Sequence, residues 1–178
     1  MTTRQRSGTA VGSRGHSDRN VMLRQFLTGG AISIGNIVIH ALVMTVVVRA
    51  SQATAARAVS RPNLLLILVM VVTVSVLMAA HACEVMVWSL AYGLVGAAPD
   101  NTNLLYFAFV NYTTLGYGDI VPVERWRLLG PMTAMNGVLL FGWSTAVIFE
   151  VLRKAMAVEA SGADNPSKNR DLSGRGRL

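Results

Sequence analysis

Cysteine is almost absent from this chain, which has Cys83 and no other among its 178 residues. A single cysteine excludes an intrachain disulfide and a zinc site built from cysteines. Charged residues are also scarce, at 14% of the chain, and most of them lie toward its two ends. A soluble globular domain usually carries more charge, and its apolar residues do not run on without interruption.

Acidic residues are few, with nine Asp and Glu against 16 Lys and Arg, which gives a net charge of +7. A basic excess can indicate a nucleic-acid partner, but the chain has no fold-sized basic domain to bind one, so we expect none. The arginines flank apolar stretches instead, where they influence membrane topology and meet anionic lipid. The first apolar stretch begins only after residue 27 and has no small-residue cleavage site behind a short core, which argues against a cleaved signal peptide.

Long apolar stretches are what the chain does contain, and there are three of them. Residues 28–48 carry no formal charge and just span a hydrocarbon core of about 30 Å. With the two later stretches they predict an all-α, multi-pass membrane protein with three transmembrane helices. The predicted segments are a disordered basic tail at 1–27, a transmembrane helix at 28–48, a polar loop at 49–63, apolar stretches at 64–95 and 128–152, and a disordered basic tail at 153–178.

The stretch 64–95 would reach about 48 Å as one helix, which is longer than one bilayer core. Either the helix tilts and projects beyond the membrane, or it bends before the next element. We favour the first, with the helix ending near Gly93 or Gly96. Trp88 and Tyr92 would then lie at the membrane interface as part of an aromatic belt.

Two pairs of polar residues interrupt the apolar stretches. Asn36 and His40 are four residues apart and therefore on one helix face. They could bind a proton or an ion, but we favour hydrogen bonds across a helix interface. His81 and Glu84 also share a face, and they fit a structural polar pair, a pH-sensing or gating element, or a metal site. Two ligands are too few for a metal site, and His40 is the only other histidine in an apolar stretch, so we expect no metal here.

A short apolar segment at 103–112 precedes the run Thr113-Thr114-Leu115-Gly116-Tyr117-Gly118-Asp119. Asp100 or Thr102 is the expected N-cap of that helix. Gly116 and Gly118 can adopt left-handed backbone conformations at little steric cost. The run resembles the filter sequence of potassium channels, Thr-x-Gly-Tyr-Gly followed by Asp, with Leu115 where most members carry Val or Ile.

In such filters, rings of backbone carbonyls replace the hydration shell of K⁺. The resemblance covers 64–152 and implies an outer helix at 64–95, a re-entrant pore helix at 103–112, a filter at 113–119 and an inner helix at 128–152. It implies ion sites formed by the carbonyls of Thr114, Leu115, Gly116 and Tyr117 with the Thr114 hydroxyl, in a filter that ends at Gly118. It also implies a supporting set and outer mouth of Thr113, Asp119, Tyr106, Phe107 and Val110.

The side chains of Leu115 and Tyr117 are expected to point away from the ions and brace the filter from behind. Tyr106 and Phe107 stand where members of the family often carry Trp, and Val110 stands where many have a carboxylate. The resemblance therefore implies a more apolar brace around this filter than in those members.

The resemblance makes Gly137 the candidate gating hinge of the inner helix, whereas Gly142 equally fits close helix contact. Helical spacing from Gly137 then predicts a cavity-lining face of Val138, Phe141, Thr145 and Phe149. Phe149 is a candidate hydrophobic gate, and the alternative is that it faces lipid or another helix.

One pore loop per chain and a four-walled filter together predict a homotetramer. The expected function is a passive, K⁺-selective channel in the plasma or bacterial inner membrane, with lipid and K⁺ as partners. We expect no enzymatic activity, no cofactor and no small-molecule substrate. The alternatives are a weakly selective cation channel, against which Tyr117 argues, a non-conducting scaffold protein, and a membrane enzyme that uses His81 and Glu84. No apolar stretch contains a row of arginines, so voltage sensing of that type is not expected.

Overall fold

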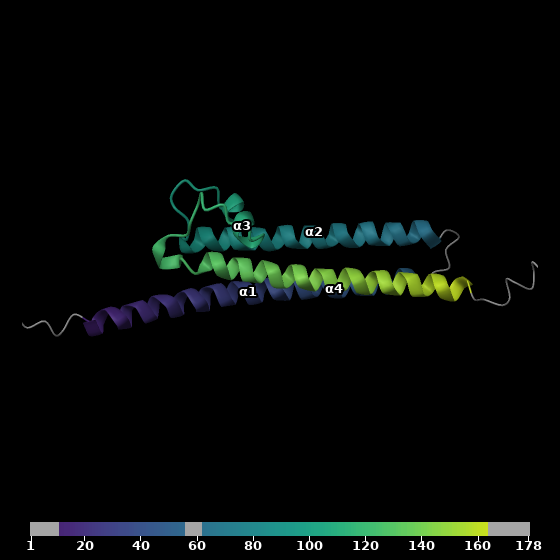
Figure 1. Ribbon diagram of the computed structural model, residues 1–178, viewed down its shortest axis with the longest axis horizontal. Helices are drawn as coiled ribbons and strands as arrows, with labels where there is room; N and C mark the ends of the chain where they lie inside the picture. The colour runs from purple at the N-terminus through teal and green to yellow at the C-terminus, as the bar shows by residue number, and fades with distance from the viewer. Residues whose placement is uncertain (1–10, 56–61, 164–178) are drawn as a thin grey trace, which may run out of the picture. The chain divides into compact units, whose positions relative to one another are not determined.

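The computed structural model describes residues 11–55 and 62–163, and in these ranges every regular element is a helix. Figure 1 labels the α-helices along the chain. The predicted all-α fold is confirmed. The elements are α1 (Val11–Ala55), α2 (Pro62–Val95), α3 (Leu104–Tyr112), a short 3₁₀ helix η1 (Glu124–Trp126) and α4 (Leu129–Ala163).

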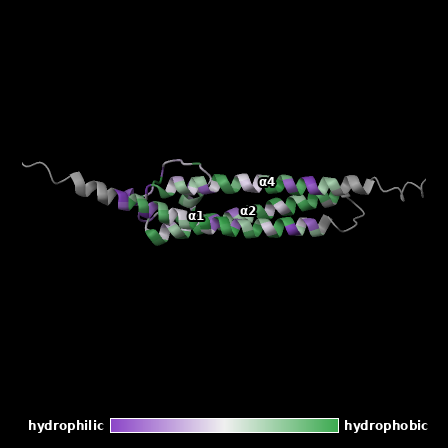
Figure 2. Cartoon of the chain, turned by 90° about the horizontal axis from the view of Figure 1, so that it is seen from below, coloured by the Kyte–Doolittle hydropathy of each residue, from purple (hydrophilic) through white to green (hydrophobic). Residues whose placement is uncertain are grey.

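Three helical segments are long and apolar enough to cross a membrane, as predicted: Arg19–Ala53, Leu66–Val95 and Glu124–Ala157. The chain buries only 17 to 33% of the most apolar part of each segment. Figure 2 shows the hydrophobic colour along the long helices. Apolar helix surface that the chain leaves uncovered needs lipid or other chains around it.

The helices extend farther into polar sequence than predicted. The expected disordered tail at 1–27 is wrong for residues 11–27, which form the beginning of α1, and the expected loop at 49–63 is helical as far as Ala55. The expected tail at 153–178 is likewise helical as far as Ala163. Once an apolar helix exists, each added residue gains a hydrogen bond without a new nucleation cost, so the helix continues into polar sequence even through weak helix formers such as Gly12 and Gly15. The rest of the predicted tails and loop, at 1–10, 56–61 and 164–178, lies outside the described residues.

The second long helix is continuous, as we favoured, and it ends where the glycine pattern predicted. Pro62 opens α2, a position where its missing N–H costs nothing. Gly96 follows the last helical residue with φ +62°, and the Ala97 N–H donates to the Tyr92 carbonyl at 2.9 Å. This is the left-handed glycine cap common at helix ends.

The described residues form two compact units. One contains α1 up to Ile39 together with Ala82–Leu140, and we name it the filter unit because it holds residues 113–119, the run that resembles a potassium-channel filter. The other contains the described parts of His40–His81 and the chain from Phe141 onward, and we name it the histidine unit.

The core of the filter unit is aromatic. Trp88, Tyr92, Phe107, Tyr112 and Trp126 are all buried in it. The prediction that Trp88 and Tyr92 form an interfacial belt is therefore wrong, because both side chains are fully buried. Their polar atoms are satisfied within the unit: the Trp88 indole N–H donates to Asn136 Oδ1 at 3.0 Å, and the Tyr92 hydroxyl lies 2.6 Å from Thr133 Oγ1.

The core of the histidine unit is aliphatic and comes from three helices. Its buried members are Met44 and Val47 of α1, Leu77 of α2, and Val147 and Val151 of α4. Thus the N-terminal helix contributes core residues to this unit beside residues of α2 and α4.

Candidate functional site

The pore-helix candidate α3 begins with a side-chain cap. Asn103 has an extended backbone, and its Oδ1 accepts a hydrogen bond from the Tyr106 N–H at 3.1 Å. The N-cap is therefore Asn103 rather than Asp100 or Thr102, because it stands three residues before an unpaired helical N–H, as a cap must. Four residues of this short helix are buried and anchor it in the filter unit: Phe107, Ala108, Val110 and Tyr112.

Residues 113–119 fold back onto the last turn of α3. The backbone N–H groups of Leu115 and Gly116 both donate to the Val110 carbonyl, at 3.0 and 3.3 Å, and the Thr114 N–H donates to the Asn111 carbonyl at 3.0 Å. The Thr113 hydroxyl donates to the Phe109 carbonyl at 2.7 Å. These bonds satisfy the carbonyls that a helix end leaves open, and they place the loop at the negative end of the helix dipole.

The backbone of this loop is left-handed at every second residue. The φ angles are +62° at Thr114, +53° at Gly116 and +78° at Gly118, whereas Leu115 and Tyr117 have negative φ. Left-handed conformations at Gly116 and Gly118 were predicted and are confirmed. Alternation of handedness turns successive peptide groups toward the same side of the chain, which is the geometry that a row of carbonyl ligands requires.

Thr114 is the strained member of the loop. A positive φ is unusual for a β-branched residue and costs about 1–2 kcal/mol. Sequence reasoning missed this conformation, because threonine carries no local signal for it. Backbone strain of this kind is concentrated at functional sites, where surrounding structure maintains it.

The side chains behind the loop are not covered by the chain itself. Leu115 is 53% exposed and Tyr117 is 67% exposed, and residues 113–119 are exposed as a group. The described residues of a single chain therefore do not supply the packing that we expected behind these two side chains.

A hydrogen bond joins Tyr106 of α3 to Asp119, the residue that follows Gly118. The Tyr106 hydroxyl donates to Asp119 Oδ2 at 2.8 Å, and Asp119 Oδ1 accepts from the Ile120 N–H at 3.0 Å. The hydrogen bond to Asp119 raises the pKa of Tyr106 above its ordinary value. Tyr106 thus supplies a polar contact beside the loop, and the comparison with the brace of other family members stays a prediction.

Glu84 is fully buried and supports the base of the loop from α2. Its carboxylate accepts a hydrogen bond from the hydroxyl of Tyr112, the last residue of α3. Nearby, Asn36 of α1 donates to the Glu84 backbone carbonyl at 3.3 Å and to Asn136 Oδ1 at 3.2 Å. The predicted interhelical hydrogen bonding of Asn36 is confirmed.

The proposed pair of His81 and Glu84 divides between the two units. Glu84 bonds to Tyr112 in the filter unit, whereas His81 Nε2 lies 2.9 Å from Ser144 Oγ in the histidine unit. The structural role and the pH-sensing or gating role considered for this pair both stay predictions.

Gly137 of α4 lies directly against the end of α3. A Cβ atom built on Gly137 would lie only 2.0 Å from the Tyr112 carbonyl oxygen, so no larger residue fits without movement of the backbone. At Gly142, by contrast, no heavy atom lies within 4 Å of such a Cβ. The close contact that we considered for Gly142 therefore occurs at Gly137.

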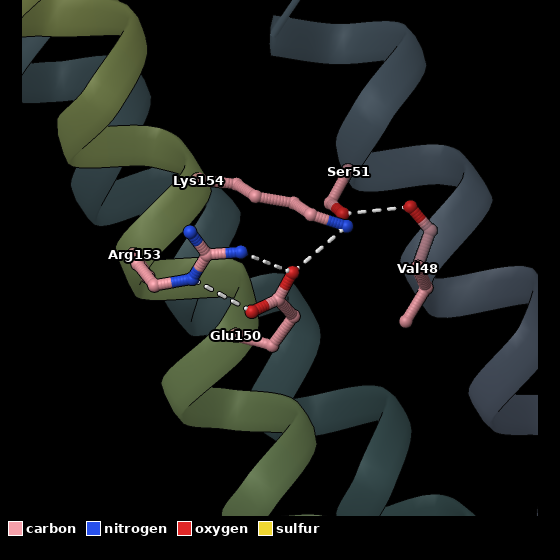
Figure 3. A network of polar contacts seen from close by, with 5 residues as sticks. All are labelled: Val48, Ser51, Glu150, Arg153 and Lys154. Atoms are coloured by element: carbon pink, nitrogen blue, oxygen red, sulfur yellow. Dashed lines mark hydrogen bonds and ion pairs between the residues drawn. The ribbon is translucent and has the colours of Figure 1, made fainter.

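The predicted cavity face of α4 is exposed in the chain. Val138 is 55% exposed, Phe141 37% and Phe149 67%, and Thr145 is exposed as well. Beyond Phe149, the Glu150 carboxylate forms ion pairs with Arg153 at 2.9 Å and with Lys154 at 3.0 Å (Figure 3). Glu150 therefore pairs with two basic residues of its own helix.

Comparison with known protein families finds one family model that matches most of the helices and the loop described above. The family model described as "Ion channel" matches residues 64–154, which is just over half of the chain. The match begins near the start of α2 and ends within α4, so it contains α3 and the loop but leaves α1 outside. Comparisons with curated proteins and with solved structures give no match. With its three candidate spans, this multi-pass membrane protein belongs to the ion-channel family that shares the two-helix potassium-channel pore.

Proposed function

We propose that this protein is a channel that passes K⁺ selectively and passively across the membrane. The carrying observation is the run Thr114–Gly118, with left-handed backbone at alternate residues, held at the C-terminal end of α3. In this proposal the carbonyls of Thr114, Leu115, Gly116 and Tyr117 and the Thr114 hydroxyl replace the hydration shell of the ion. Asp119, oriented by Tyr106, stands at the outer mouth.

The proposed assembly is a homotetramer with fourfold cyclic symmetry. Each chain has one such loop, and four are needed to surround an ion. The exposure of Leu115 and Tyr117 supports this assembly, because neighbouring copies would cover side chains that one chain leaves open. The exposed residues Val138, Phe141, Thr145 and Phe149 would then line the cavity on the other side of the filter.

We expect no catalytic activity and no bound organic cofactor, since the proposed mechanism needs only backbone carbonyls and a pore. Two alternatives remain distinct from it: a weakly selective cation channel, and a scaffold protein that retains the pore fold without conducting. Tyr117 favours the selective channel, because less selective relatives often differ at that position.

Reconstitution of the purified protein into liposomes separates the three. We expect K⁺ flux, and in mixed K⁺ and Na⁺ solutions a reversal potential close to that of K⁺. A reversal potential that lies midway between those of the two ions would indicate the weakly selective channel. No flux from a protein that elutes as a tetramer would indicate the scaffold.

A further inference from the structure

Three polar side chains of the histidine unit converge, and each comes from a different helix. His40 lies on α1, His81 on α2 and Ser144 on α4. Ser144 Oγ lies 2.9 Å from His81 Nε2 and 3.3 Å from His40 Nε2. His40 is fully buried, Ser144 is 5% exposed and His81 is half-buried. One hydroxyl thus stands between two imidazole nitrogens inside apolar helices.

Aromatic neighbours hold the two imidazoles in place. The ring centroids of His40 and His81 are 5.3 Å apart. One ring nitrogen of His40 lies within 4.8 Å of one ring nitrogen of His81. The His40 ring packs beside Trp143, with centroids 5.5 Å apart, and the His81 ring packs beside Phe141 at 4.5 Å. Because these rings are already ordered, a ligand that binds between them loses little further side-chain entropy.

We propose that His40, His81 and Ser144 form a binding site for a divalent first-row transition metal ion, with Zn²⁺ as the representative. Imidazole is a preferred ligand of Zn²⁺, Cu²⁺ and Ni²⁺. A zinc–nitrogen bond is about 2.0–2.1 Å long, so small rotations of the two side chains bring both nitrogens onto one ion. The neutral Ser144 hydroxyl oxygen supplies a third donor, weaker than the two imidazoles, and the ion keeps an open position, as zinc does in sites with three protein ligands.

The site gives the N-terminal helix a role that the pore family does not supply. Helix α1 lies outside the matched residues 64–154, yet it provides one of the two imidazoles. A bound ion would tie α1 to α2 and α4 through their own side chains.

The effect on conduction rests on the proposed function. Phe141 belongs to the proposed cavity face, and its ring packs against His81. An ion that reorients His81 therefore disturbs a cavity-lining residue, and we expect bound Zn²⁺ to reduce K⁺ flux.

Binding is tested first, without any flux measurement. Purified full-length protein in detergent is titrated with Co²⁺, whose visible absorption changes with its ligands, and Zn²⁺ is then added to displace it. We expect one saturable site per chain. His40→Gln and His81→Gln should each weaken binding at least about tenfold, and Ser144→Ala should weaken it by about tenfold. The matched controls, His16→Gln and Cys83→Ser, remove the remaining histidine and the single thiol and should bind as the unmodified protein does.

Three results would overturn the site: no saturable binding, full affinity in the His40→Gln/His81→Gln double variant, or loss of binding in Cys83→Ser. If the double variant does not fold, the thermal midpoint decides, because a ligand that binds only the folded state stabilises it. Zn²⁺ must then raise the midpoint of the unmodified protein more than that of Ser144→Ala, and an equal shift contradicts the proposal.

In liposomes, Zn²⁺ should slow K⁺ flux in the unmodified protein and in His16→Gln but not in the double variant. Absence of flux under every condition would count against the proposed function, and the Co²⁺ titration would still decide the site.

Discussion

At the scale of single residues, the substitution Gly116→Ala is the most direct test of the proposed filter. Its φ of +53° is one that alanine avoids, although a Cβ would meet nothing nearer than the Thr114 carbonyl oxygen at 3.9 Å. Alanine therefore opposes the backbone conformation and not the packing, at about 1–2 kcal/mol. We expect Gly116→Ala to abolish K⁺ flux and leave assembly intact, as measured by liposome flux and size-exclusion elution. The control is Gly35→Ala in α1, where no heavy atom lies within 4 Å. Unchanged selective flux in Gly116→Ala would refute the filter assignment.

Glu84 tests whether a buried carboxylate supports the base of the loop. Glu84→Leu removes the acceptor of the Tyr112 hydroxyl, and we expect the thermal midpoint to fall by an amount equivalent to about 1–3 kcal/mol. Glu84→Gln keeps an acceptor oxygen and should lose less. Because Glu84 and Tyr112 are direct partners, the effects of Glu84→Leu and Tyr112→Phe should not add in the double variant. Additive losses would show that the hydrogen bond contributes nothing to stability.

At the scale of elements, the contact between α4 and α3 distinguishes two roles for Gly137. A Cβ at this position would overlap the Tyr112 carbonyl oxygen, one residue before the loop begins. We therefore expect Gly137→Ala to destabilise the protein by about 1–3 kcal/mol, which is typical of overpacking, and to reduce K⁺ flux. Gly142→Ala, on the same helix with open space around it, should be neutral or stabilising by about 1 kcal/mol. If Gly137→Ala alters channel opening but not the thermal midpoint, the glycine acts as a hinge and not through close packing.

The C-terminal end of α4 carries the candidate gate. Phe149 is 67% exposed and is followed by Glu150, which is paired with Arg153 and Lys154. Four such rings could close a pore by excluding water. Phe149→Ala should raise open probability in single-channel recordings and leave the ratio of K⁺ to Na⁺ permeability unchanged, because other residues form the proposed filter. If Phe141→Ala raises open probability and Phe149→Ala does not, the constriction is at Phe141 and the assignment of Phe149 is wrong.

At the scale of the whole molecule, the proposed filter predicts the orientation in the membrane. If the filter faces outside, α4 ends inside, and three spans place the N-terminus outside. The charge rule does not decide, because three arginines precede the apolar stretch 28–48 (Arg14, Arg19 and Arg24) and three follow it (Arg49, Arg57 and Arg61). We expect protease to remove an N-terminal tag from intact cells. Access only from the cytoplasmic side would imply that the segment 28–48 does not cross.

How much of this molecule could be predicted depended on how local each feature is. Apolar runs long enough to span a bilayer showed that there are three long helices, and the glycine after α2 marked its end. The glycines at 116 and 118 likewise predicted their own left-handed backbone. Helix ends were less predictable, because polar residues such as those at 11–27 form helix once an apolar helix is present to extend.

Contacts between distant residues were decided only by the tertiary structure. Trp88 and Tyr92 are residue types that favour the membrane interface, but both are buried here. Asn136 of α4 accepts a hydrogen bond from the Trp88 indole, and Thr133 of α4 is hydrogen-bonded to the Tyr92 hydroxyl, so burial leaves neither polar group unpaired. Gly137 and Gly142 look alike in sequence, yet only Gly137 meets another backbone. His40 and Ser144 are 104 residues apart in the sequence. The spacing of residues within one helix does not predict which residue of another helix they will contact. The sequence alone determined the helices, the filter run and the family to which they belong, since each depends on neighbouring residues. Which buried polar groups face one another depended on how the helices pack.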